Sequence, residues 1–121
     1  MIKIYKTSNS VKRMKQIIEW MNSYNLEYKV ISTTELSDEI LKEILAVSER
    51  GLYDIILSRN NSSIVHKIEL DKYNIEDMTV NEVIKFILKN PDLLKGPIIF
   101  DEKKLLVGYN STEIRKFIPK Y

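Results

Sequence analysis

The chain has 121 residues, of which 44% are hydrophobic and 30% are charged, and this size and balance predict one compact domain over residues 1–121. It contains no cysteine and one histidine, which excludes disulfide scaffolds, thiolate zinc sites, thiol redox enzymes and histidine-rich metal sites. The net charge of +2 is far from the footprint of an autonomous DNA-binding protein. No apolar run approaches the roughly 20 residues that span a bilayer. We therefore expect a cytoplasmic protein with no cofactor and no membrane contact.

The first 30 residues predict a strand, a helix and a second strand. Residues 2–5 are an apolar run typical of a buried strand. Residues 26–30 alternate between apolar and charged side chains, the period of a half-buried strand. A strand–helix–strand crossover of this length implies that the two strands are parallel. The helix between them is indicated by apolar residues at steps of three and four: Val11, Met14, Ile17, Ile18, Met21 and Tyr24.

The middle of the chain predicts helices. Ser37 is a candidate N-cap for a helix that continues to Val47, and Gly51 is expected to end it as a left-handed C-cap. Residues 52–59 suggest another short helix. Thr79 to Glu82 form a capping-box pattern, with Met78 and Val83 as a hydrophobic staple. The helix that follows should end at Asn90–Pro91 and bury four side chains: Val83, Ile84, Ile87 and Leu88.

The last quarter predicts two antiparallel strands and a final helix. Strands at 97–100 and 104–107 are joined by a tight turn, and the pattern of residues 110–113 can cap a helix carrying Ile114, Phe117 and Ile118. The element order β-α-β-α-α-α-β-β-α is that of an α/β, thioredoxin-like fold: a four-stranded mixed sheet with a helical insertion over about residues 36–94. A cis peptide bond is expected before Pro97, at the start of its strand.

Few residues suggest chemistry. Thioredoxin-like proteins use the loop after the first strand, but residues 6–14 contain no thiol here. Ser8 and Ser10 are better explained as helix caps than as nucleophiles, because no base is placed beside them. Lys12 and Arg13 offer only a weak signal for an anion. Three further features are assigned to the surface or to packing: His66, Trp20 and the carboxylates of Asp101–Glu102.

Residues 90–110 closely resemble the Spx branch of the arsenate reductase-like family, and the segment 113–119 also fits that branch. The likeness continues more loosely through residues 36–40, 50–51 and 55–59. It implies a cytoplasmic transcription regulator that binds the C-terminal domain of the RNA polymerase α subunit and reaches DNA only through the polymerase. The family's C-terminal recognition tail for proteolysis is expected to be absent.

Three positions depart from that family pattern, and one matches it. The family's Cys-x-x-Cys switch falls near Val11 and Met14, so the resemblance implies that the switch is missing. Arg59 matches one of the arginines that hold the oxyanion in arsenate reductases, but Gly96 stands where another is expected before the proline. Reductase activity therefore has no evident chemical route.

We accordingly expect a non-enzymatic, redox-insensitive module that binds the polymerase α subunit. The family's contact surface includes a glycine that matches Gly51, and Arg50 together with the cations Lys12, Arg13 and Lys15 offers charge for an acidic partner. Two other classes remain open: an adaptor or degenerate thioredoxin-fold protein that does not bind polymerase, and an arsenate reductase-like oxidoreductase.

Overall fold

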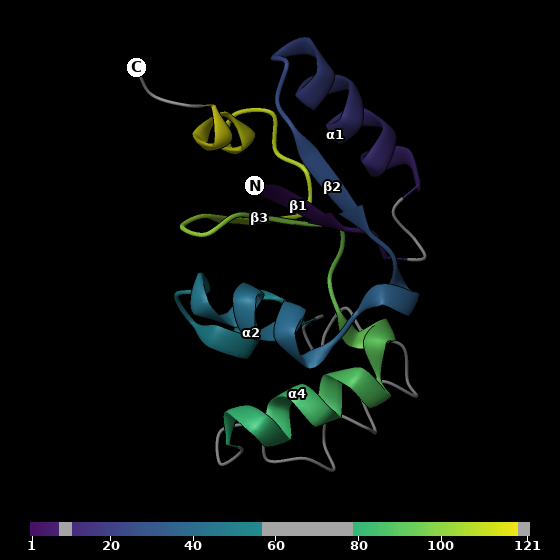
Figure 1. The fold of residues 1–121 in the computed structure, drawn as a ribbon, viewed down its shortest axis with the longest axis vertical. Helices are drawn as coiled ribbons and strands as arrows, with labels where there is room; N and C mark the ends of the chain where they lie inside the picture. Colours follow the sequence, from purple (N-terminus) through teal and green to yellow (C-terminus); the bar gives the residue numbers. More distant parts are fainter. Residues whose placement is uncertain (8–10, 57–78, 119–121) are drawn as a thin grey trace.

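A four-stranded mixed sheet lies at the centre of the molecule, with helices on both faces (Figure 1). The computed structural model describes residues 1–7, 11–56 and 79–118, except the side chains of residues 52 and 53. The sheet order is β2-β1-β3-β4, with β1 parallel to β2 and the other neighbours antiparallel. This confirms the predicted thioredoxin-like arrangement. The strands are β1 (Ile2–Tyr5), β2 (Tyr28–Ile31), β3 (Ile98–Phe100) and β4 (Leu105–Val107).

One face of the sheet is covered by α1 (Val11–Ser23) and by the 3-10 helix η6 (Glu113–Phe117). Their apolar side chains meet the inward residues of the strands in one core cluster, whose members include Ile4, Ile17, Met21, Ile99 and Phe117. The predicted stripe of α1 is confirmed at Met14, Ile17 and Met21 but is wrong at its ends. Val11 and Tyr24 are exposed because they lie at and beyond the helix termini, outside the area that the sheet covers.

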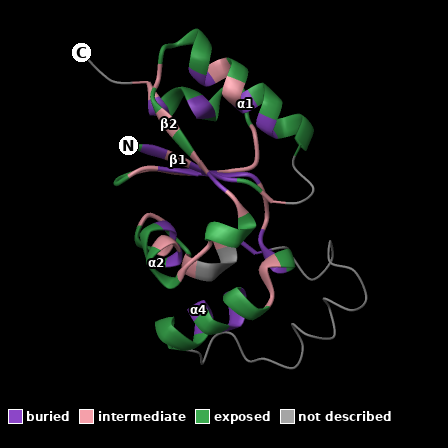
Figure 2. Cartoon of the chain, turned by 45° about the vertical axis from the view of Figure 1, so that its right-hand side comes forward, coloured by how far each residue is buried: buried purple, intermediate pink, exposed green. Residues whose placement is uncertain are grey.

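The other face is covered by α2 (Asp38–Ala46) and α4 (Val80–Lys89) (Figure 1). Three 3-10 helices connect this lobe: η1 (Thr33–Glu35), η2 (Gly51–Asp54) and η5 (Pro91–Leu93). The second core cluster joins this lobe to the sheet, with Leu41, Ile44, Ile87 and Leu93 inaccessible to solvent. The green and purple sides of α4 in Figure 2 show its amphipathic character. No helix in the described part of the chain is long and apolar enough to cross a bilayer.

The predicted caps of α2 and α4 are largely confirmed. The Ser37 hydroxyl accepts a hydrogen bond from the Ile40 N–H at 3.3 Å, and the Thr79 hydroxyl accepts one from the Glu82 N–H at 3.2 Å. The Glu82 carboxylate accepts a hydrogen bond from the Thr79 hydroxyl, in place of the backbone contact of a full capping box. The staple partner Met78 lies outside the described residues.

The buried face of α4 differs from the prediction by one position. Phe86 is 4% exposed, whereas Leu88, predicted to be buried, is 39% exposed. Phe86 and Leu88 both border the apolar stripe of Val83, Ile84 and Ile87. The side of the stripe that carries the Phe86 ring faces the core.

Other boundaries also move. α2 ends at Ala46, so Gly51 is not its C-cap, although its φ of +59° confirms the predicted left-handed conformation. The predicted helix over 52–59 is the short η2 followed by an isolated bridge between Ile56 and Leu94, and residues 57–59 lie outside the described residues. β2 runs to Ile31 and begins at Tyr28, not at Leu26.

The C-terminal quarter agrees with the sequence prediction. The Gly96–Pro97 bond is cis, as predicted. The Asn110 side chain caps the last helical segment, since its Oδ1 accepts hydrogen bonds from the N–H groups of Thr112 at 2.9 Å and Glu113 at 3.0 Å. That segment is a 3-10 helix, which suits its length of five residues.

Candidate partner-binding surface

The positions that would carry the redox chemistry of a thioredoxin-like protein are occupied by apolar side chains. Val11 is 69% exposed at the start of α1, and Met14 is 4% exposed in the core beneath that helix. Neither side chain can form a thiolate or a disulfide, because the chain contains no cysteine. Ser8 and Ser10 lie outside the described residues, as do Arg59 and His66.

The place of an anion-binding arginine before the proline is closed. A Cβ atom added at Gly96 would lie 2.0 Å from Thr7 Oγ1, 2.2 Å from Thr7 Cγ2 and 2.6 Å from Thr7 Cβ. Real Cβ atoms do not approach other atoms this closely. Thr7, which follows β1, and the segment before β3 therefore pack together only because position 96 has no side chain. An arginine at this position requires that Thr7 move.

An exposed corner follows α2 on the opposite side of the sheet from α1. We call the segment Glu49-Arg50-Gly51, together with Asp54, the α2–η2 corner. Asp54 holds it in place: Oδ2 accepts a hydrogen bond from the Arg50 backbone N–H at 2.9 Å, and Oδ1 accepts one from Arg50 Nε at 3.0 Å. The Arg50 side chain is nevertheless 77% exposed. The corner therefore presents a positioned guanidinium to solvent.

Gly51 gives the corner its open shape. Its φ is +59°, a left-handed conformation that glycine adopts without steric cost. No heavy atom outside its chain neighbours lies within 4 Å of the place that a Cβ would occupy. The absence of a side chain is thus required by the backbone conformation and not by contacts within the described part of the protein.

Arg50 also sets the charge of the corner. Its backbone N–H is the largest of the contacts that lower the pKa of Asp54, and the side-chain hydrogen bond and the guanidinium charge add to it. Asp54 therefore becomes protonated at a lower pH than an ordinary aspartate, and its ion pair with Arg50 is lost only as pH falls through that lower pKa.

The remaining predicted cations are not part of this corner. Lys12, Arg13 and Lys15 are exposed on α1, which covers one face of the sheet, whereas the α2–η2 corner belongs to the lobe on the other face (Figures 1 and 2). The residues predicted from the sequence therefore lie in two separate areas. Arg50 and Gly51 lie together, and the three cations of α1 form the second area.

A groove beside β4 was missed in the sequence prediction. Arg50 and Asp54 line this groove of about 500 Å³ together with the β3–β4 hairpin and η6. Lys103, Lys104 and Lys116 add cations from segments far from Arg50 in the sequence. The sequence signal available for it was the predicted C-terminal hairpin, because the last strand of a hairpin often has a free side.

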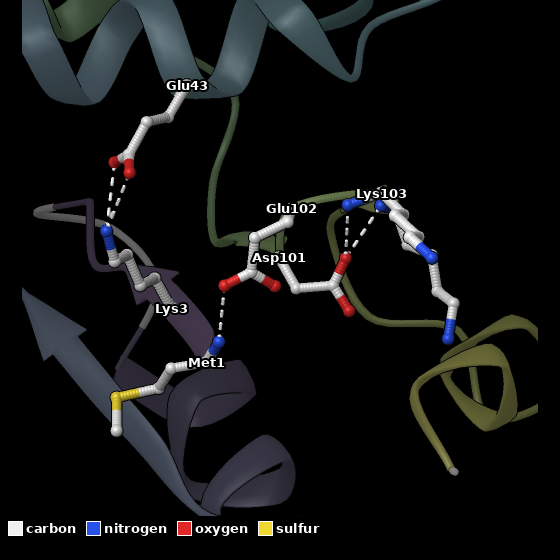
Figure 3. Close-up of polar contacts among 7 residues, drawn as sticks. Met1, Lys3, Glu43, Asp101, Glu102 and Lys103 are labelled. Atoms are coloured by element: carbon white, nitrogen blue, oxygen red, sulfur yellow. Dashed lines mark hydrogen bonds and ion pairs between the residues drawn. The ribbon is translucent and has the colours of Figure 1, made fainter.

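The carboxylates of Asp101 and Glu102 have separate structural contacts (Figure 3). Asp101 Oδ1 accepts hydrogen bonds from the N–H groups of Lys103 at 2.8 Å and Lys104 at 2.7 Å, which closes the hairpin turn. Glu102 Oε1 lies 2.6 Å from the terminal ammonium of Met1, and this hydrogen bond lowers the pKa of Glu102. The pair thus belongs to the turn and to β1, and does not form a shared acid–base site.

Polar contacts also join the α2 lobe to the sheet. Lys3 on β1 lies 2.9 and 3.0 Å from the two carboxylate oxygens of Glu43 on α2 (Figure 3). Trp20 and Tyr24 pack against each other along α1 with ring centroids 4.8 Å apart. Both contacts are of the kind that stabilises a fold, and neither brings together groups suited to catalysis.

Comparison with known proteins places these features in a family context. The model of the ArsC family matches residues 4–117. The global transcriptional regulator Spx 1 of Oceanobacillus iheyensis is 37% identical over 122 residues, which cover 99% of this chain and 88% of that protein. The global transcriptional regulator Spx of Streptococcus mutans is 38% identical over 103 residues, which cover 84% of this chain and 72% of that protein.

Solved structures share the fold. SACOL0876 from Staphylococcus aureus matches with a TM-score of 0.73 and 16% identity, covering 96% of this chain and 97% of that one. A possible arsenate reductase from Streptococcus mutans matches with a TM-score of 0.69 and 15% identity, covering 97% of this chain and 98% of that one. At these identities the likeness shows the thioredoxin-like ArsC fold alone.

Proposed function

The chain belongs to the ArsC family, and we propose that it is a non-enzymatic transcription regulator that binds the C-terminal domain of the RNA polymerase α subunit. The relatives named as global transcriptional regulators support the regulatory role, since their similarity extends over 84% to 99% of this chain. Contact with DNA is indirect in this proposal and runs through the polymerase complex.

The α2–η2 corner is the observation that carries the proposed contact. Arg50 is positioned by Asp54 while most of its side chain remains in solvent. A guanidinium held in one geometry loses little side-chain freedom when it meets a carboxylate on a partner. The neighbouring Gly51 adds no side chain, so a partner surface can approach the backbone closely.

The cations of α1 take a secondary role in this proposal. Lys12, Arg13 and Lys15 are exposed but belong to the other face of the sheet. Charges outside the direct contact raise the rate of association with an acidic partner more than they raise affinity. We therefore assign the direct contact to Arg50 and Gly51, and long-range attraction to the α1 cations.

The absence of catalysis is supported by two features of the residues. A thiol is missing from the whole sequence, so neither an arsenate–thiolate intermediate nor a disulfide can form on this chain. Thr7 also occupies the space that a side chain at position 96 would need. The same lack of thiols makes the proposed regulator insensitive to thiol oxidants.

Direct binding to the purified α C-terminal domain tests the proposal. Biolayer interferometry with the immobilised α domain should give saturable binding of the native chain, and a triple Lys12→Glu, Arg13→Glu, Lys15→Glu variant should lower the association rate more than it raises the dissociation rate. Absence of binding would favour an adaptor without polymerase contact. Turnover of arsenate in a thiol-coupled assay would establish the enzymatic alternative.

A further inference from the structure

The outer edge of β4 presents backbone groups that no strand pairs. β4 is the last strand in the order β2-β1-β3-β4. The Asp101 N–H donates to the Lys104 carbonyl at 3.0 Å, and the Gly108 N–H donates to the Pro97 carbonyl at 2.7 Å. Because antiparallel pairs alternate, these two bonds direct the N–H and C=O groups of Leu105 and Val107 away from β3.

Most of these outward groups lack a partner. The Leu105 carbonyl accepts a hydrogen bond from the Lys116 ammonium. The Leu105 N–H and both backbone groups of Val107 have no hydrogen-bond partner within residues 1–7, 11–56 and 79–118. An extended peptide adds to a sheet by pairing with such outward N–H and C=O groups, which recur at every second residue of an edge strand.

The groove beside this edge favours negative charge. Its walls carry Arg50, Lys103, Lys104 and Lys116 against Glu49, Asp54 and Glu113. Arg50 and Asp54 form an ion pair and compensate each other, so three lysines remain against Glu49 and Glu113 and the groove keeps an excess of positive charge. The terminal nitrogens of Arg50 have no hydrogen-bond partner in the described part of the chain and remain available to a carboxylate.

The two sides of the edge differ in polarity. Leu105 and Val107 pack with the partly buried Val47 on the α2 side of the sheet. Lys104 is two residues from Leu106, which packs on the η6 side, and Lys116 belongs to η6 itself. An added strand would thus meet an apolar row on one side and two lysines on the other.

We propose that the β4 edge binds an extended, acidic segment of a partner protein by strand addition. Apolar side chains of that segment continue the row of Leu105, Val107 and Val47. Carboxylates at the alternate positions meet Lys104 and Lys116. Lys116 then exchanges its contact with the Leu105 carbonyl for a carboxylate, and the carbonyl accepts an N–H from the incoming strand.

This binding can be told apart from the proposed polymerase contact by Gly51. Glu49, Arg50 and Asp54 belong to the α2–η2 corner and also line the groove, whereas Gly51 does not line it. Gly51→Arg should therefore remove polymerase binding without weakening the binding of the acidic peptide. Failure of one proposal is in this way distinguishable from failure of the other.

A capped hexapeptide of alternating valine and glutamate is the probe. Its titration into ¹⁵N-labelled protein should shift the amide signals of Leu105 and Val107 and slow their hydrogen exchange. A valine–lysine peptide should bind about tenfold more weakly or not at all, because it reverses the charge. The valine–glutamate peptide methylated on alternate backbone nitrogens should also bind about tenfold more weakly, because the methyl groups remove two hydrogen bonds.

Two variants of one residue separate backbone from side-chain contributions. Val107→Pro removes the outward N–H at a position where an edge strand tolerates proline, and it should weaken binding about tenfold. Val107→Ala keeps the N–H and should retain most of the affinity. The proposal is overturned by equal binding of the methylated peptide, by shifts that avoid the β4 amides, or by concentration-dependent pairing of the chain alone through these amides, which would assign the edge to a second copy.

Discussion

Substitution of Gly51 separates the conformational role of this glycine from its role in a contact. Any residue with a Cβ at φ +59° pays roughly 1 kcal/mol for the left-handed conformation. The side chain itself meets no obstacle, since no heavy atom lies within 4 Å of the Cβ position. Gly51→Ala and Gly51→Arg should therefore lose similar stability, equivalent to a fall in Tm of about 3–6 °C for a domain of this size.

Binding should distinguish the two variants. An arginine at position 51 places a long cationic side chain between the corner and a closely approaching partner, and part of its charge loses water on contact. We expect Gly51→Arg to weaken binding to the α C-terminal domain at least about a hundredfold, which corresponds to roughly 2.7 kcal/mol. Gly51→Ala should stay within about tenfold of the native affinity.

Gly108 supplies a matched control. It has φ +80°, and nothing lies within 4 Å of its Cβ position either. Gly108→Arg adds the same charge at a similar conformational cost, but at the end of β4 instead of the α2–η2 corner. Gly51→Asn is a further control, because Asn25 already adopts φ +53° in this chain and asparagine tolerates that region.

The assay is biolayer interferometry at fixed ionic strength, with thermal unfolding of each variant measured in the same buffer. Native-like binding by Gly51→Arg would remove Gly51 from the interface. Equal losses for Gly51→Arg and Gly108→Arg would mean that added charge or lost stability explains the effect. Equal losses for Gly51→Ala and Gly51→Arg would leave only the backbone conformation as the cause.

Three further outcomes are expected. Gly96→Ala should destabilise the protein by about 1–3 kcal/mol, because its Cβ clashes with Thr7. In a double-mutant cycle measured by chemical denaturation, Thr7→Gly should restore part of this loss. Additive losses of stability in the two variants would contradict the clash. The pKa of Asp54 is lowered in the folded protein, so its contribution to stability is present above the ordinary aspartate pKa of 3.8 and is lost as pH falls through the lower folded pKa. The Tm difference between the native protein and Asp54→Asn should accordingly shrink in acid. A Tm difference that stays constant with pH would argue against the ion pair. Diamide should change neither Tm nor polymerase binding, because no thiol is present, and a reversible change with a cysteine-free partner would refute redox insensitivity.

The periodicity of the sequence was sufficient to predict the main elements. β1 has the predicted bounds, and the stripes of α1 and α4 gave most of their buried residues. The errors occur where two positions satisfy the same period. Phe86 and Leu88 both border the apolar stripe of α4, and only the shape of the neighbouring core decides which of them is buried.

The ends of elements were harder to predict, because tertiary pairing sets them. Leu26 belongs to the alternating pattern but precedes the strand, whereas Ile31 pairs with Tyr5 and extends β2 beyond the alternation. The conformation of Gly51 was predicted correctly from residue type, but its role was not, because α2 ends five residues earlier. Local chemistry thus indicates φ more reliably than it indicates which helix a residue terminates.

The residues of the candidate site were also hard to group from the sequence, because tertiary structure decides which of them share a surface. The sequence prediction joined Arg50 with Lys12, Arg13 and Lys15 because all four offer charge for an acidic partner. A crossover helix and a later insertion cover opposite faces of the sheet, and the structure accordingly separates them. Lys104 and Arg50 are distant in the sequence but line one groove. Charge pattern alone cannot assign residues to a surface until the sheet order is known.

The proposed function relies on exposed surfaces and not on the redox site of the fold. A thioredoxin-like domain concentrates its chemistry where the first strand meets the first helix, and there this chain lacks a thiol and fits Thr7 against Gly96. In the function proposed for this chain, an exposed surface acts in place of that chemistry. The α2–η2 corner is suited to this, because Asp54 fixes Arg50 before any partner arrives and so lowers the entropic cost of association. Loosening Arg50 by removing Asp54 should therefore weaken binding even though the arginine itself is retained.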